Sequence, residues 1–217
     1  PRLAYMGWTI AVYSVMFGGI FAAGSAMTQE FEQVTMDELV LSNQSPSSIY
    51  LGKMLSGALI AHVALPLLFL LSFVLFGVWP NGDILVFLIL TVLLALFSSG
   101  LGLIAGAILR NSVFLVPVAA LGAIFYWITG GGIAPLELVG VTFGVLNEYL
   151  PFSNVYRSMI RMFVEGSYGT LLTDLSVIGL FALVIMILSP VLADRVGQID
   201  YSHKLEELKR RRKQSHE

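Results

Sequence analysis

The chain contains no cysteine, which excludes disulfide bonds, thiol catalysis and metal sites built on cysteine. It also lacks a phosphate-binding loop. Gly52-Lys53 has Ser47 where such a loop has its first glycine, and Met54 where it has serine or threonine. We therefore expect that this chain does not hydrolyse nucleotide and is not an enzyme.

Titratable groups that could form a catalytic or metal site are scarce as well. His62 is the only titratable side chain deep in an apolar stretch, and no carboxylate lies within helical reach of it. A neutral, hydrogen-bonded histidine is the favoured interpretation, although an ionisable group inside a membrane is by default a functional hypothesis. The sequence predicts no catalytic residue and no metal ligand.

Charge is sparse: only 12% of the 217 residues are charged and 57% are hydrophobic. A soluble domain carries about a quarter charged residues. Five charge-free stretches reach the roughly 17 to 20 residues that a helix needs to cross the hydrocarbon core. They must be helices because an open strand would leave unpaired backbone groups in lipid. The sequence thus predicts an all-α polytopic membrane protein, a single domain over 1–217, with spans at about 4–27, 49–79, 84–109, 113–129 and 171–192.

The basic residues indicate the topology. Lysines and arginines gather after the last span, between Lys204 and Lys213. The positive-inside rule then places the tail 193–217 and the polar segment 28–53 in the cytoplasm, and the segment 130–169 outside. The same count places Pro1 outside and close to the membrane, so we expect at least one earlier helix to be missing from this sequence. The basic run is too short to predict nucleic-acid binding.

The polar, acidic segment 28–53 is longer than a simple turn requires. Thr35 and Glu38 have the spacing of a capping box and predict a short helix over 36–42. Ser45-Pro46 predicts the start of the next helix, since serine is a good N-cap and proline fits the first helical position. The short helix is either a tidy interfacial turn or an element that docks on another protein. We favour docking because helices this short are marginal alone.

The outer segment 130–169 is apolar in part. Residues 135–146 are too short to cross the membrane and predict a re-entrant or interfacial hairpin. From Pro151 the pattern becomes amphipathic and predicts a helix lying in the outer interface, with a substrate-exit lid as an added possibility. Asp174, at the outer end of the last span, is expected to be solvated. The apolar face would carry Phe152, Val155, Tyr156, Met159, Ile160 and Phe163, and the polar face Ser153, Asn154, Arg157, Ser158 and Arg161.

Small residues recur at helix-packing intervals in two spans. Such faces let helices approach closely, within one chain or across a dimer. The predicted faces are Ser14, Gly18, Ala22 and Ala26 in the first span, and Ser98, Gly102 and Gly106 in the third.

The segment 28–53 resembles the cytoplasmic loop of type-2 ABC exporter permeases, which have the G-type or A-type transmembrane fold. Val34 stands where the family usually has glycine, Asp37 where it has glutamate and Asn43 where it has proline. The matching residues are Glu30, Glu32, Thr35, Met36, Asp37 and Leu39, followed by Gly52-Lys53. Further similarity lies in Gly100-Leu101-Gly102, Gly130–Gly132, Pro135, Pro151 and Arg161.

This resemblance implies a six-helix permease half of which the chain supplies helices two to six; the missing part is the first helix, with or without an external domain. Segment 28–53 would hold a coupling helix that docks on a cytoplasmic ABC ATPase subunit. No cofactor belongs to this chain, and ATP and Mg would be bound by that subunit. The implied coupling residues begin with Thr35 and include acidic groups that meet basic residues of the ATPase, namely Glu30, Glu32, Asp37 and Glu38, and apolar groups that fill a groove, namely Met36, Leu39 and Val40.

A second permease half, identical or different, would enclose a path lined by the first and fourth spans. The candidate lining residues are Phe17, Phe21, Leu121 and Phe125. A charge-free path suits lipid-like, amphipathic or drug-like molecules, exported across the plasma membrane. The alternative is a membrane scaffold or assembly subunit without transport of its own. An ion channel is disfavoured because no polar stripe is present.

Overall fold

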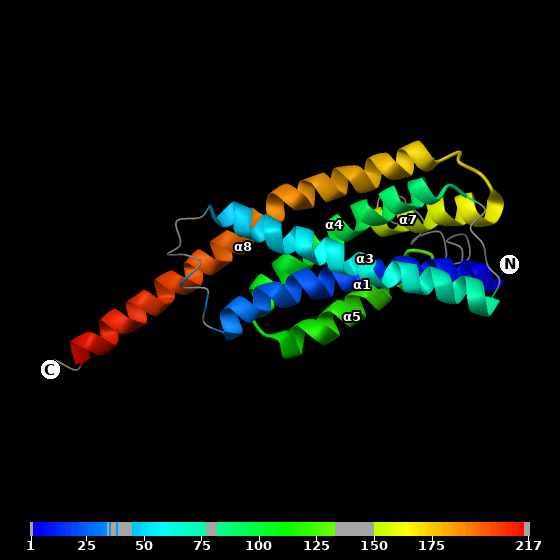
Figure 1. Cartoon of the computed structure of the whole chain (residues 1–217). Coiled ribbons are helices and arrows are strands. Elements are labelled where there is room, and N and C mark those ends of the chain that lie inside the picture. Colours follow the sequence, from blue (N-terminus) through cyan, green and yellow to red (C-terminus); the bar gives the residue numbers. More distant parts are fainter. Residues whose placement is uncertain are drawn as a thin grey trace.

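The computed structural model describes residues 2–33, 35, 38, 45–76, 82–132 and 150–214. Within these ranges the chain is almost entirely helical and contains no strand. Successive long helices run back and forth along one bundle, and the last one extends beyond it (Figure 1). The helices are α1 (Arg2–Glu32), α3 (Pro46–Phe76), α4 (Ile84–Leu109), α5 (Ser112–Thr129), α7 (Pro151–Ile160), the π-helical turn η2 (Arg161–Glu165) and α8 (Leu171–Gln214).

Five of these helices are long and apolar enough to cross a membrane, which confirms the predicted all-α membrane fold. The apolar stretches cover Gly7–Glu32, Ser47–Leu68, Ile84–Leu109, Ser112–Thr129 and Leu171–Val196. Helix α8 has 44 residues and continues well past the predicted end of the last span. Its polar second half holds mostly good helix formers, so nothing in its composition stops the helix there.

The helix starts follow the capping residues of the sequence. Helix α3 begins at Pro46, and the Ser48 amide donates to the Ser45 hydroxyl at 3.4 Å, as predicted. The Asp83 carboxylate accepts from the Leu85 amide at 2.8 Å and caps α4. These polar side chains satisfy amides that would otherwise lack a partner at the helix ends.

Helix α1 lies between α3 and α4, and small residues bring both neighbours close to it. A side chain on Gly102 of α4 would meet the Ile20 carbonyl at 2.2 Å, and one on Gly106 would meet the Gly24 carbonyl at 2.4 Å. On the α3 side, a side chain on Gly18 would lie 3.2 Å from the Ala61 Cα atom. The predicted face of α4 therefore packs as expected. In α1 the contact with α4 instead runs through Ile20 and Gly24. The predicted face contacts α3 at Gly18, so it is not the face that packs against α4.

The polar face of α7 is buried by the chain itself rather than open to solvent, and the interfacial position of this helix stays a prediction. Its polar residues Ser153, Asn154 and Ser158 are buried, and α7 packs against the start of α8. Asp174 of α8, predicted to be solvated, is 0% exposed. The apolar side of the same segment faces α1, where the Phe163 ring stacks on Trp8 with centroids 4.5 Å apart.

A hydrogen-bond network makes the burial of Asp174 possible. Its carboxylate forms an ion pair with Arg157 and accepts from the hydroxyls of Ser158 at 2.5 Å and Thr170 at 3.0 Å. Arg157 also donates to the Asn154 side-chain carbonyl. A buried charge is tolerated when it is paired and hydrogen-bonded in this way. The polar face of α7 therefore serves as the contact surface for α8.

The close approach of α1 and α4 leads to a first prediction. We expect Gly102→Ala to destabilise the protein by about 1–3 kcal/mol, since the added methyl group would overlap the α1 backbone. Gly122→Ala in α5 is the matched control because a side chain there meets no atom within 4 Å. Thermal unfolding in detergent measures both. Equal midpoints for the two variants would contradict the packing described here.

The buried network leads to a second prediction. We expect Asp174→Ala to cost about 3–5 kcal/mol, because it leaves the Arg157 guanidinium without its carboxylate. A double variant, Arg157→Met with Asp174→Leu, should recover part of that loss. Asp83→Asn is the control, since asparagine caps a helix as well as aspartate does. Unfolding midpoints measure the stability of each variant. If Asp174→Ala proved as stable as Asp83→Asn, the hydrogen-bond network would not stabilise the protein as described.

Candidate functional site

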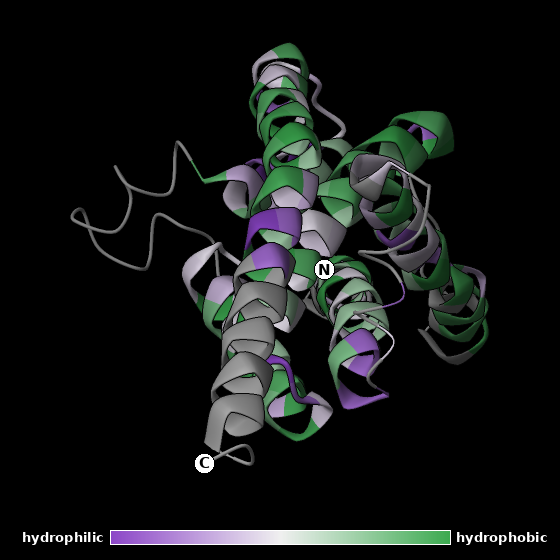
Figure 2. Cartoon of the chain, turned by 90° about the vertical axis from the view of Figure 1, so that its left-hand side faces the viewer, coloured by the Kyte–Doolittle hydropathy of each residue, from purple (hydrophilic) through white to green (hydrophobic). Residues whose placement is uncertain are grey.

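Helices α1, α3, α4, α5 and α8 meet at the end of the bundle where the polar segment lies. This loop end consists of residues 26–33, 35, 45–54, 107–112 and 193–196. Beneath its polar groups lies a small apolar cluster from α1, α3, α4 and α8, formed by Met27, Tyr50, Leu103, Ala107 and Ala193. Figure 2 looks onto this end: hydrophilic residues occur near the helix ends, whereas the helix shafts are largely hydrophobic.

One face of the last turns of α1 is bound to α3. The Lys53 ammonium of α3 forms an ion pair with Glu30 of α1 and also donates to the Ala26 carbonyl at 2.9 Å. The two charged side chains are only 16% and 18% exposed, so water screens this pair less than a surface pair. Glu30 accepts a further hydrogen bond from the Thr35 hydroxyl. The start of the polar segment is thereby tied to both α1 and α3.

The opposite face of α1 is bound to the turn between α4 and α5. The Glu32 carboxylate accepts from the Ser112 amide at 2.6 Å and from the Ser112 hydroxyl at 2.9 Å. The Thr28 hydroxyl lies 3.0 Å from that same hydroxyl. The Arg110 guanidinium lies over the Phe31 ring, 5.2 Å from its centroid, which is a cation–π contact. Thr28, Phe31 and Glu32 share one helix face because they are three and four residues apart.

The α4–α5 turn that α1 contacts is very tight. Arg110 adopts the left-handed conformation, with φ 55°, and its amide donates to the Gly106 carbonyl at 2.9 Å. Asn111 then caps α5 by accepting from the Val113 amide at 2.8 Å. The first turn of α5 is consequently held by its own cap and by the carboxylate of Glu32 from α1.

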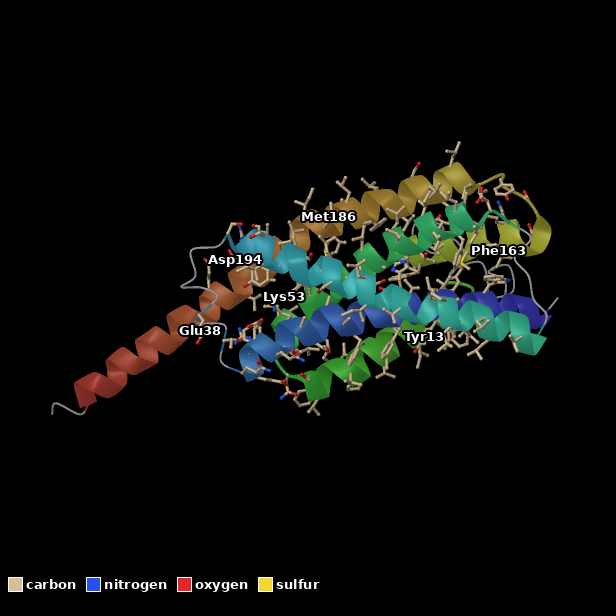
Figure 3. All side chains as sticks on the ribbon, viewed as in Figure 1. Tyr13, Glu38, Lys53, Phe163, Met186 and Asp194 are labelled. Atoms are coloured by element: carbon tan, nitrogen blue, oxygen red, sulfur yellow. The ribbon has the colours of Figure 1, made fainter. Side chains whose placement is uncertain are left out.

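The structure describes half of the predicted coupling residues. Glu30, Glu32 and Thr35 are engaged as described above, and Glu38 is helical and exposed. Figure 3 shows Glu38, Lys53 and Asp194 at the same end of the bundle. The remaining four, and most of the short helix expected over 36–42, lie outside the described residues: Met36, Asp37, Leu39 and Val40. The capping role of Thr35 and the contacts of all eight residues with an ATPase stay predictions.

The predicted path residues lie on neighbouring helices, α1 and α5. Tyr13, Phe17 and Phe21 form a ladder of nearly parallel rings on α1, with centroids 6.2 and 5.8 Å apart. Phe21, Leu121 and Phe125 are exposed at the surface of this single chain, whereas Phe17 is partly buried. Sequence analysis missed Tyr13, although its spacing of four residues from Phe17 was a visible signal. The function of this surface remains a prediction.

His62 is hydrogen-bonded within its own helix, as the sequence favours. Its Nδ1 atom lies 2.8 Å from the Ala58 carbonyl, one helical turn away. Among the described residues no group of three or more histidine, aspartate or glutamate side chains could hold a metal ion.

Two partners at the loop end were not predicted. The sequence pattern indicates Lys53 only as part of the Gly52-Lys53 pair and does not indicate Ser112. The signal for Lys53 was a lone cation at the boundary of an apolar span, which needs a nearby carboxylate. Ser112 gave no comparable signal, because its partner Glu32 lies 80 residues away in sequence.

Comparison with known proteins places this geometry in a family. A model of the ABC-2 type transporter family matches residues 4–164. The match spans α1, α3, α4, α5 and α7, and so includes the polar segment, its two sets of contacts and the aromatic ladder. No curated protein matches the chain. The family model covers well over half of the sequence, and the chain therefore belongs to the ABC-2 type transporter family, as a multi-pass membrane permease.

Proposed function

We propose that this chain is the permease subunit of an ATP-driven exporter, and that its segment 28–53 is the coupling element for a separate ATPase subunit. The family match over residues 4–164 is the observation that carries the proposal. The permease family acts by transport, and the chain has no phosphate-binding loop of its own. ATP and Mg would be bound and ATP hydrolysed on the partner subunit.

The positions of the charged segments support a cytoplasmic loop end. The basic sequence 204–213 belongs to the last part of α8, which projects from the same end of the bundle as the polar segment (Figure 1). Basic residues flank spans on the cytoplasmic side. The ATPase would thus meet the segment containing exposed Glu38 and its neighbours Asp37 and Leu39. Glu30 and Glu32 would anchor that segment to the helices.

The apolar surface of α1 and α5 supports a lipid-like, amphipathic or drug-like substrate. Half of the α5 residues are exposed, including Val113, Leu121 and Phe125, and the aromatic ladder of α1 lies beside this helix. A second permease half, identical or related, would cover this surface and enclose the path at the plasma membrane. Molecules with large apolar groups gain from such a lining, whereas small ions find no polar ligands there.

The coupling role can be tested at Leu39. We expect Leu39→Asp to leave the protein folded in membranes but to abolish its co-purification with the ATPase, because a charge would enter an apolar docking groove. Ser47→Asp is the matched control: it adds the same charge at the same end, on an exposed residue of α3. Affinity purification and ATP hydrolysis by the purified complex are the measurements.

The outcome separates transport from the scaffold alternative. If Leu39→Asp retains its ATPase partner as well as Ser47→Asp does, the proposed coupling element is wrong. If the unsubstituted chain co-purifies only with partners that lack an ATPase domain, the chain is a membrane scaffold or assembly subunit.

A further inference from the structure

The two faces of the α1 terminus hold two different helices by two different sets of contacts. On one face, Glu30 and the Ala26 carbonyl bind Lys53 of α3. On the other face, Glu32 binds the start of α5 through Ser112. Ala26 and Glu30 are one turn apart, whereas Glu32 follows Glu30 by two residues and therefore points away from it.

We propose that Glu32 is the positioning residue that transmits movement of the polar segment to α5, while the Glu30–Lys53 pair transmits it separately to α3. This inference rests on the proposed function. It assigns Glu30 to the movement of α3 and Glu32 to the movement of α5. Neither glutamate then needs to contact the ATPase itself.

The location of Glu32 supports a mechanical role. A carboxylate at the C-terminal end of α1 is poorly placed for its own helix, because that end already carries negative partial charge. At the start of α5 the same carboxylate meets the positive end of a helix and two donors, both from Ser112. The contact is thus favourable only while α1 and α5 keep their mutual position. A displacement of the α1 terminus would either pull α5 with it or break both hydrogen bonds.

The packing of α5 explains why this contact would matter. Only 17% of its apolar stretch is buried in this chain, against 50% for α1 and for α4. Within this chain, helix α5 is held mainly by its contacts with α1. Thr28 and Phe31, on the same face as Glu32, also contact this junction, through Ser112 and Arg110.

The absence of cysteine allows a direct test with single fluorescent labels. Val118→Cys on α5 and Leu59→Cys on α3 replace exposed residues, 48% and 73% accessible, and each is labelled with bimane. The permease–ATPase complex in proteoliposomes is then exposed to Mg with a non-hydrolysable ATP analogue. The response of each label is compared in the unsubstituted background, in Glu32→Gln and in Lys53→Gln.

We expect each of the two substitutions to weaken the response of one label and to leave the other label unaffected. Glu32→Gln should reduce the response at position 118 by at least about fivefold, the lower end of typical coupling between sites, and leave that at position 59 intact. Lys53→Gln should do the reverse. Asp194→Asn is the control: it removes a charge at the same end, where the carboxylate accepts from Gln198 at 2.8 Å, and it should change neither response.

Three results would overturn the inference. They are loss of both responses in Glu32→Gln, loss of neither, and failure of Glu32→Gln to co-purify with the ATPase, which would make Glu32 a contact of that subunit. If Glu32→Gln does not fold, Ser112→Ala carries the test, since it removes one of the two hydrogen bonds and should weaken only the response at 118. No ATP-analogue response in the unsubstituted complex would refute the proposed function instead.

Discussion

Helix α1 can lie against the α4 backbone only because Gly102 and Gly106 have no side chains. At these positions even a methyl group would overlap carbonyl oxygens of α1. The close contact makes α1 the central helix, with α3 on one side, α4 on another and α5 alongside it between Tyr13 and Glu32. The C-terminal turns of α1 therefore lie close enough to contact the helices next to the polar segment. Close packing through small residues is the usual way to hold helices together where water supplies no hydrophobic driving force.

At each end of this bundle, one shielded ion pair joins two different helices. At one end Asp174 pairs with Arg157 and binds two hydroxyls. At the other, Lys53 pairs with Glu30. These pairs tie α7 to α8 and α1 to α3. Removing one partner would leave a shielded charge, which costs more than the intact pair contributes. The polar pairs thus fix the positions of the helix ends, while apolar side chains pack the middle of the bundle.

The sequence alone predicted what depends on local pattern. Charge-free stretches located the five spans, because crossing the membrane requires about 20 apolar residues. Ser45-Pro46 located the start of α3, since capping involves only neighbouring residues. The polar face of α7 was misread because periodicity shows that a face is polar but not what it contacts. Its true partner, Asp174, belongs to the next helix.

Partners distant in sequence were beyond prediction for the same reason. Glu32 and Ser112 are 80 residues apart, and nothing local marks them as a pair. Resemblance to exporter permeases assigned Glu30 and Glu32 alike to an ATPase surface. The structure shows that their carboxylates bind different helices of the chain itself, and their contacts with an ATPase stay a prediction. The predicted contacts of Met36, Asp37, Leu39 and Val40 are still to be tested, because these residues lie outside the described part of the chain.

The central claim is that the α1 terminus and the start of α5 move as one unit during the ATP-driven cycle. Thr28 and Ser112 offer the most direct test, because their hydroxyl oxygens are 3.0 Å apart. Thr28→Cys with Ser112→Cys, in a chain without other cysteines, should form a disulfide on mild oxidation, since facing side chains this close suit its geometry. ATP hydrolysis by the cross-linked permease–ATPase complex is the measurement. Our account predicts that oxidation leaves turnover within about twofold of the reduced complex, well below typical coupling effects. Loss of turnover on oxidation, restored by reductant, would show that α1 and α5 must separate and would contradict it.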